Sequence, residues 1–206
     1  MVRKNNDLRR EKILDAAVRQ VQTRGLAAVR VADVADELGV SSALVFYHFA
    51  SKEQLIAETF ARAAQRDLDR LDRVCARKTS AVERLKAVLR LYSPTGEAGS
   101  WRIWIEGWAM AVRDREVRAV LRRLDIRWKD AIANLIEEGT AAGEFHCPDA
   151  HAAAVRITAY VDGLAVQTMV RKRALPRASL HDWLAVMAAA ELGITAEELG
   201  RFGRGG

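Results

Sequence analysis

One short segment of the sequence, residues 34–45, carries the side chains that two helices crossing over a tight turn require. Ala35 is small where the two helices would approach, and Gly39 can adopt the left-handed conformation that the turn needs. The wedge between the helices would be filled by Leu38, Val40 and Val45. The second helix then presents a polar and aromatic face to solvent, which predicts a helix-turn-helix that reads the major groove of DNA. Two ordinary helices joined by a glycine are the alternative interpretation.

A second group of chemically capable side chains is aromatic and lies later in the chain. Five apolar residues share one face of a predicted helix, with two further aromatic residues as expected neighbours: Trp101, Trp104, Ile105, Trp108 and Val112, then Tyr92 and Trp128. Because small-molecule sites are mostly aromatic with a few polar groups, this pattern indicates a pocket wall. Plain core packing of the tryptophans is the alternative.

An acidic residue, Asp162, stands on the apolar face of another predicted helix. Its face-mates are Val155, Ala159, Val166 and Met169. A carboxylate in apolar surroundings must find a partner. Two partners are open: an Arg or Trp of the same fold, or a ligand. Aromatic faces together with a carboxylate could hold a cation.

The elements that would position these residues are all helical. Periodicity and capping signals predict helices over 8–24, 31–38, 42–49, 51–77, 81–92, 101–113, 115–142, 150–173, 179–192 and 196–200. Residues 93–100 form the clearest loop. Ser51 with Gln54 indicates a capping box, and Ser179 is the expected cap of its helix. No strand or internal repeat is predicted, so the fold class is all-α.

Composition limits the function classes. The chain has 206 residues, half of them hydrophobic and 29% charged, which is enough for a sizeable core. The net charge is +6, but residues 1–50 hold eight Lys/Arg against six Asp/Glu. Only the first twelve residues are clearly basic, with Arg3, Lys4, Arg9, Arg10 and Lys12. A DNA-binding hypothesis therefore rests on the helix-turn-helix and not on bulk charge.

Several classes of protein lack their usual signals here. Cys75 and Cys147 have no metal or redox spacing, which indicates reduced thiols. We find no signal peptide and no apolar run near the ~20 residues that a membrane span needs, so a cytoplasmic protein without a membrane partner is expected. A phosphate loop, a metal-binding His/Glu pair and a nucleophile elbow are also missing. We therefore predict no enzyme, no catalytic residue, no metal and no cofactor.

The residues around the second helix of the motif match a known pattern. Val45-Phe46-Tyr47-His48-Phe49, followed by Ser51-Lys52-Glu53 and Leu55, resembles the signature of the tetracycline-repressor family, and residues 8–56 fit its three-helix DNA-binding domain. The resemblance implies that residues 42–48 are the recognition helix. It further implies that DNA is contacted by Arg30, Ser41, Ser42, Ala43, Leu44, Tyr47, His48 and Lys52, with Tyr47, His48 and Lys52 gripping mainly the backbone.

This sequence departs from the family pattern at two places. Arg30 stands where a Ser or Thr cap is usual, and Ser42 stands where a Lys or Arg is common. The recognition helix has no Arg, Lys, Asn or Gln, the side chains best suited to reading guanine or adenine. We expect sequence reading to depend on serine hydroxyls, on thymine-methyl contacts from Ala43 and Leu44, and on DNA shape.

The C-terminal part is similar to one branch of the same family. Trp101, Trp104 and Trp108, then Gly143-Glu144-Phe145 and Asp162-Gly163-Leu164, resemble a choline-sensing-repressor-like C-terminal domain over residues 101–192. The resemblance implies a small-molecule effector, not identified by the sequence, and a homodimer on a palindromic operator. The candidate effector-binding residues are Tyr92, Trp101, Trp104, Trp108, Trp128 and Asp162.

These inferences give a domain plan and a function. Residues 1–50 form the predicted DNA-binding domain, and 51–206 form the effector-binding and dimerisation domain. The dimer seam is expected on the last two long helices, from Val161, Leu164, Thr168, Leu184, Met187 and Ala188. The leading hypothesis is a ligand-responsive repressor. In it, the helix starting at residue 51 links the effector-binding domain to the DNA-reading helix-turn-helix, which is called the reader below. An activator and a nucleoid-like coating protein are the alternatives, and a pocket argues against coating.

Overall fold

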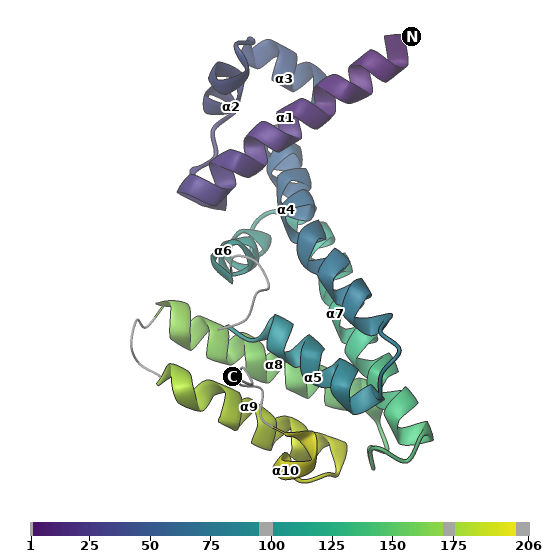
Figure 1. Cartoon of the computed structure of the whole chain (residues 1–206). Helices are drawn as coiled ribbons and strands as arrows, with labels where there is room; N and C mark the ends of the chain where they lie inside the picture. The colour runs from purple at the N-terminus through teal and green to yellow at the C-terminus, as the bar shows by residue number, and fades with distance from the viewer. Residues whose placement is uncertain (1, 95–100, 171–175, 201–206) are drawn as a thin grey trace. The chain divides into compact units, whose positions relative to one another are not determined.

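The computed structural model describes residues 2–94, 101–170 and 176–200, and within these ranges the chain is helical with no strand. The elements in chain order are α1 (Val2–Arg24), the 3₁₀ helix η1 (Leu26–Ala28), α2 (Val31–Leu38), α3 (Ser42–His48), α4 (Lys52–Cys75), α5 (Ala81–Tyr92), α6 (Trp101–Ala111), α7 (Arg115–Ala141), α8 (Ala150–Val170), α9 (Arg177–Leu192) and α10 (Ala196–Leu199). The all-α expectation is confirmed (Figure 1). None of the described helices is long and apolar enough to cross a membrane.

Local sequence signals set most helix ends. Gly39 ends α2 in the left-handed conformation, at φ 64°. The Ser51 hydroxyl accepts the backbone N–H of Gln54 at 3.0 Å, while the Gln54 side chain accepts the N–H of Ala50, one residue before the position of an ideal capping box. The predicted loop residues 95–100 and the predicted helix end at 171–173 lie outside the described residues.

Two predicted helix starts were wrong. α1 begins at Val2, six residues before the predicted start at 8. α9 begins at Arg177 with Pro176 as its N-cap, so Ser179 lies inside the helix and does not cap it. The physical reason is that proline, with φ fixed at −67° here, already places the chain at the entrance of a helix.

The chain divides into two compact units. Unit 1 comprises Met1–Arg66 and Arg102–Leu124, and unit 2 comprises Asp67–Trp101 and Asp125–Gly206. In unit 1, α1 packs on α2, and α2 packs on α3 (Figure 1). The predicted stripe of α1 is its buried face: Ile13, Leu14, Ala17, Val18 and Val21 are all at most 7% exposed. Phe49 and Phe60 complete this core as fully buried rings.

In unit 2, α8 packs on α9, and α10 packs on α9 (Figure 1). Four residues predicted for a dimer seam, Val161, Leu164, Leu184 and Ala188, are 0–8% exposed within the single chain. Thr168 and Met187 are half-buried. Thr168 and Met187 therefore stay predicted seam residues, but the prediction was wrong for the four buried ones. They pack inside unit 2, because α8 and α9 use this apolar face against the rest of their own unit.

Candidate functional site

The turn between α2 and α3 is built as the sequence predicts. The backbone N–H of Gly39 donates to the Asp36 carbonyl at 3.1 Å, and that of Val40 donates to the Ala35 carbonyl at 3.0 Å. These bonds satisfy carbonyls that the end of a helix leaves without partners. Ala35 and Val45 are buried at the contact of the two helices, and Val40 is half-buried. The helix-turn-helix geometry is therefore fixed by local bonds and a small apolar wedge.

The face of α3 that points to solvent carries most of the predicted DNA contacts. Tyr47 is 74% exposed, and Ser41 and Ala43 are also exposed, while Ser42 and Leu44 are half-buried. The Ser41 hydroxyl accepts the N–H of Leu44 at 3.3 Å and caps the helix. Its own O–H still has a hydrogen to donate, so the residue can cap α3 and contact a partner at once.

Two predicted DNA-contacting cations come before and after this helix in the chain. Arg30 occupies the N-cap position of α2 but makes no side-chain cap bond, and Lys52 is the first residue of α4. Both are exposed, and neither forms an ion pair with another described residue. They are available to a phosphate, as the sequence predicts for both.

His48 is half-buried at the end of α3, and its pKa is lowered. Burial is the main cause, and the positive charges of Arg9 and Arg10 add to it. His48 is thus neutral at neutral pH, so it can offer a phosphate a hydrogen bond but no charge. Its neighbour Phe49 is a packing residue: it is 1% exposed, and the Arg10 guanidinium lies 4.7 Å from its ring centroid.

Four of the six predicted effector residues meet in unit 2 and are called here the Tyr92 cluster: Tyr92, Trp101, Trp128 and Asp162. Tyr92 stacks on Trp128 with ring centroids 4.7 Å apart and lies 5.3 Å from Trp101 at a tilt of 46°. Each ring is at most 8% exposed. The Tyr92 hydroxyl donates to Oδ1 of Asp162 at 2.6 Å. Helices α5, α6, α7 and α8 thus each supply one member.

The carboxyl group of Asp162 has one hydrogen-bond donor and no ion pair within the described residues. Burial raises its pKa to about 6, and the negative charge of Asp125 adds to that rise. The Tyr92 hydrogen bond and the charge of Lys129 act the other way. Lys129 itself pairs with Asp125 at 2.7 Å. The partner is thus a tyrosine, not the Arg or Trp that the sequence led us to consider.

The surroundings of Asp162 also differ from the expectation of a buried apolar face. Val155, Val166 and Met169 are 37–41% exposed, and Ala159 is exposed. The buried face of α8 is the neighbouring one, which includes Ile157 and Val161 at 0% exposure. Asp162 therefore stands at the edge between the buried and the exposed faces of its helix.

The other predicted tryptophans belong to unit 1. The Trp104 ring packs edge-on against Phe60, with centroids 5.6 Å apart, and both Trp104 and Trp108 are half-buried. Val112, placed on the same face by the helical pattern, is 74% exposed and lies just past the end of α6. The single aromatic stripe of the sequence is thus divided between two units after Trp101.

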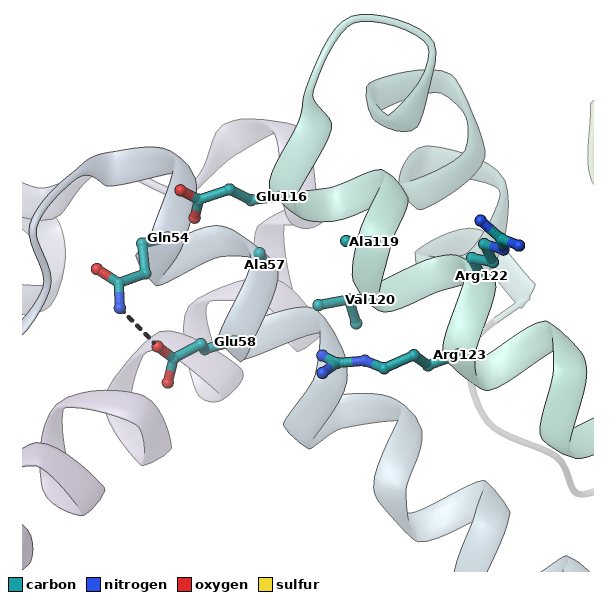
Figure 2. A pocket seen from close by; sticks show the side chains of 8 residues that line it. All are labelled: Gln54, Ala57, Glu58, Glu116, Ala119, Val120, Arg122 and Arg123. Atoms are coloured by element: carbon teal, nitrogen blue, oxygen red, sulfur yellow. Dashed lines mark hydrogen bonds between the residues drawn. The ribbon is translucent and has the colours of Figure 1, made fainter.

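Unit 1 also contains an open pocket of about 500 Å³ between the first turns of α4 and α7 (Figure 2). Figure 2 shows acids and an amide toward one side, with Arg122 and Arg123 toward the other. Glu58 already accepts hydrogen bonds from Gln54 and pairs with Arg10. No aromatic residue lines the pocket, so it differs in chemistry from the Tyr92 cluster. Among the described residues no group of side chains could hold a metal ion.

Two family models match this chain. Residues 13–59 match the family model of bacterial regulatory proteins, tetR family, and residues 81–193 match that of the BetI-type transcriptional repressor, C-terminal. The HTH-type transcriptional regulator BetI of Agrobacterium fabrum is 33% identical, with 84% of this chain and 82% of that protein covered. The BetI regulator of Rhizobium meliloti is 32% identical, with 80% and 79% covered.

A solved structure shows the same likeness. The putative transcriptional regulator from Saccharomonospora viridis, crystallised in complex with choline, is 32% identical. It matches over 86% of this chain and 94% of its own, with a TM-score of 0.75. Since the C-terminal family model alone spans more than half of the residues, the chain belongs to the TetR family of transcriptional regulators, with a helix-turn-helix DNA-binding part and a BetI-type repressor C-terminal domain.

Proposed function

We propose that this regulator is a repressor that leaves its operator when the Tyr92 cluster binds a small organic cation of the quaternary ammonium class. The observation that carries the proposal is Asp162, a half-buried carboxylate with no ion-pair partner among the described residues and with three aromatic rings in its cluster. An uncompensated carboxylate costs folding free energy, which a bound cation would recover.

The chemistry of the cluster favours a cation without N–H groups. Aromatic faces attract such cations through their quadrupoles, and the attraction is strongest where water is excluded. Tyr92, Trp101 and Trp128 provide buried rings, and Asp162 provides the counter-charge. The buried indole N–H of Trp128 has no hydrogen-bond acceptor within the described residues. A ligand oxygen would satisfy it, which favours an amino alcohol such as choline over a plain tetraalkylammonium ion.

The choline complex of the Saccharomonospora viridis regulator supports this choice, because that protein shares the fold and a third of its residues with this chain. Choline is therefore the effector that we propose to test first. Trp104 and Trp108 stay predicted effector residues, although the known contact of Trp104 is with Phe60.

We infer that the DNA contacts are those predicted from the sequence: Arg30, Ser41, Ser42, Ala43, Leu44, Tyr47, His48 and Lys52. Five of them are exposed and the other three, Ser42, Leu44 and His48, are half-buried, so none is closed off within its unit, which supports this assignment. The boundary between DNA-binding and effector domains near residue 50 also stays a proposal. Because operator DNA lies in the bacterial cytoplasm, we propose that the protein acts there.

A homodimer is proposed because two recognition helices must meet successive major grooves of a palindrome. The exposed apolar side chains of α8 and α9 support it: Val155, Val166, Met169, Val170, Trp183 and Val186, each 37–63% exposed. Apolar residues gathered on two neighbouring helices are the pattern of a self-complementary interface. We therefore propose these residues for the dimer interface instead of the buried Val161, Leu164, Leu184 and Ala188.

The test is calorimetric titration of the full-length protein with choline, followed by operator binding with and without choline. The operator is first located by footprinting DNA upstream of the neighbouring genes. The control ligand is 3,3-dimethylbutan-1-ol, the neutral shape analogue of choline. We expect choline to bind and to weaken operator affinity, and the alcohol to do neither. Equal binding of both compounds would contradict a cation site, and choline binding without operator release would contradict its role as inducer.

A further inference from the structure

The corner between α1 and α2 is held by two side chains from α6, which lies far along the chain and outside the helix-turn-helix. Oε2 of Glu106 accepts the backbone N–H of Leu26 and, at 3.4 Å, that of Ala27. The guanidinium of Arg102 donates to the carbonyl of Arg24 and, at 2.8 Å, to Oε1 of Glu106. We call these contacts the corner clasp. All of its members belong to unit 1.

The groups that the clasp engages are those that helix ends leave unsatisfied. Arg24 is the last residue of α1, and Leu26 and Ala27 open the adjoining 3₁₀ helix. Terminal carbonyls and N–H groups of helices have no partner within the helix. A carboxylate bonded to such N–H groups makes charge-assisted hydrogen bonds, which are stronger than neutral ones. Helix α6 therefore supplies side-chain partners to the corner, which otherwise has the bond from the Gly25 N–H to the Val21 carbonyl at 2.9 Å and the Arg24–Asp33 ion pair at 2.7 Å.

Gly25 shows independently that the corner is shaped around the clasp. Its φ is +93°, and a Cβ there would overlap the Arg102 guanidinium and lie 2.6 Å from Oε1 of Glu106. A side chain at this position would displace the clasp residues. On the opposite side α6 packs against α4: Gly107 leaves room for the Phe60 ring, which would lie 2.9 Å from an added Cβ. Helix α6 thus contacts both the corner and α4.

The corner leads directly into α2, the first helix of the helix-turn-helix. Arg30, two residues after η1, is the N-cap of α2, and α2 packs on α1 and on α3. A change at the corner would alter the packing of α2 on α1 and, with it, the position of α3. We propose that Glu106 and Arg102 are positioning residues for DNA recognition, through which α6 sets the placement of the recognition helix without contacting DNA.

This proposal also deepens the proposed function and, for its effector part, rests on it. Trp101, a member of the Tyr92 cluster, is the first residue of α6, and Arg102 is the next. One peptide bond thus joins the cluster to the clasp. A ligand that shifts Trp101 would act on Arg102 through the backbone of the same helix, in addition to any effect through α4.

The first experiment measures operator affinity of full-length Glu106→Gln, with Glu116→Gln as the matched control. Glu116 is an exposed acid of the same unit, so both variants lose one negative charge. Loss of an acid near DNA by itself strengthens binding. Glutamine replaces one of the two carboxylate oxygens by an NH2 donor, which would face the N–H of either Arg102 or Leu26. We expect Glu106→Gln to weaken operator binding about tenfold and Glu116→Gln to leave it equal or stronger.

Two further readouts separate positioning from mere stabilisation. Operator affinity is measured well below the melting temperature and is scaled to the fraction of protein that is active. A variant that is only less stable, but still folded, then binds the operator normally. The salt dependence of Glu106→Gln should stay close to that of the wild type, because neither clasp residue is proposed to contact a phosphate. Arg102→Lys keeps the charge but cannot reach both acceptors, so it should weaken binding similarly, and the double variant should add little. Normal affinity in both single variants would overturn the proposal.

A separate experiment tests whether α6 couples effector binding to operator binding. With choline as the probe, we expect the ratio of operator affinities without and with ligand to fall toward one in Glu106→Gln, while choline affinity in the absence of DNA stays that of the wild type. An unchanged ratio would overturn the coupling through α6. If choline fails to bind the wild type, the proposed effector is wrong, and the operator measurements on the clasp variants still decide the positioning role.

Discussion

The two sites hold their functional side chains in opposite ways. The DNA-reading surface of unit 1 is exposed and contiguous in sequence, and its helices end in local caps such as Gly39 and Ser41. The Tyr92 cluster of unit 2 is buried and assembled from four helices, with Tyr92 and Asp162 seventy residues apart. One site fits a large partner that covers it from outside, and the other fits a small one that replaces internal contacts.

The DNA-reading surface and the Tyr92 cluster also differ in which charged side chains have no ion-pair partner. Two acids of α2 in unit 1 are paired: Glu37 accepts hydrogen bonds from Arg19 and Gln20, which lower its pKa, and Asp33 pairs with Arg24. The cations Arg30 and Lys52, which we propose as DNA contacts, form no ion pair with another described residue. In unit 2, Asp162 has no ion-pair partner among the described residues, and burial raises its pKa. Each site is thus charged to complement its proposed partner.

The variant Asp162→Asn is expected to have the largest effect, and it tests whether the Tyr92 cluster uses its carboxylate as a counter-charge. Without the counter-charge, choline affinity should fall at least about 100-fold, the order expected when a buried charge pair is lost. The same change should stabilise the ligand-free protein at pH 7.5 by about 2–3 kcal/mol. The asparagine carbonyl can still accept the Tyr92 hydroxyl, and the cost of the buried charge is gone.

The sign of that stability change depends on pH. The folded-state pKa of Asp162, about 6, exceeds the ordinary value of an unfolded chain, so the cost of ionisation is absent below about pH 4 and complete above pH 6. The stability gain of Asp162→Asn should therefore vanish on acidification. Denaturant titrations at pH 7.5 and 4 measure it, with the exposed Asp130→Asn as control. A destabilised Asp162→Asn at pH 7.5 would show that the carboxylate serves structure.

A second test acts on the same site without mutation. Protonation of Asp162 competes with cation binding, so choline affinity of the wild type should fall about tenfold between pH 7.5 and pH 5. The titratable and charged groups that act on it are Tyr92, Asp125 and Lys129. Of these, Tyr92 has a pKa raised well above 10 by burial, so it stays neutral throughout. Calorimetry at several pH values, with circular dichroism to confirm folding, measures the effect; flat affinity would exclude Asp162 from the site.

A third test concerns the reader. Lys52→Ala should weaken binding to operator and to unrelated DNA alike, by several-fold, and should lower the salt slope by about 1, because one phosphate contact releases one counter-ion fewer. Tyr47→Ala is the comparison: it loses a neutral contact of a 74% exposed ring, so affinity should fall with little change of slope. Fluorescence anisotropy at four salt concentrations separates the two. Identical slopes for Lys52→Ala and wild type would remove Lys52 from the phosphate contacts.

The sequence predicted the reader better than the effector site for a physical reason. A helix-turn-helix is encoded by neighbours in the chain, so Gly39 and the wedge residue Val45 could be assigned before any tertiary contact was known. The Tyr92 cluster depends on long-range packing. Its residues were recognised as candidates, but the helical pattern placed Trp104 with Trp101, whereas the structure divides them between units.

Helix α8 shows where pattern reading fails. Apolar residues surround most of this helix, so periodicity cannot decide which face turns inward. The face with Val161 and Leu164 is buried in its own unit, and the face with Val155, Val166 and Met169 is left exposed. The corner clasp was also beyond sequence reading, because Arg102 and Glu106 at spacing i, i+4 form an ordinary surface pair until the fold brings Leu26 beside them.

The smallest expected effect tests whether the reader is held by its local bonds. Ser41→Ala removes the hydroxyl that accepts the N–H of Leu44 and leaves that N–H only its bond to the Ser41 carbonyl, at 3.0 Å. Such a change costs about 1 kcal/mol of stability. Ser42→Ala is the matched control, because Ser42 is the first residue inside α3 and does not cap it. Denaturant unfolding should show the loss for Ser41→Ala alone, and hydrogen exchange at Leu44 should speed up only in that variant. If both serines tolerate alanine equally, α3 is held by its packing on α2, and the contrast between a locally encoded reader and a tertiary effector site weakens accordingly.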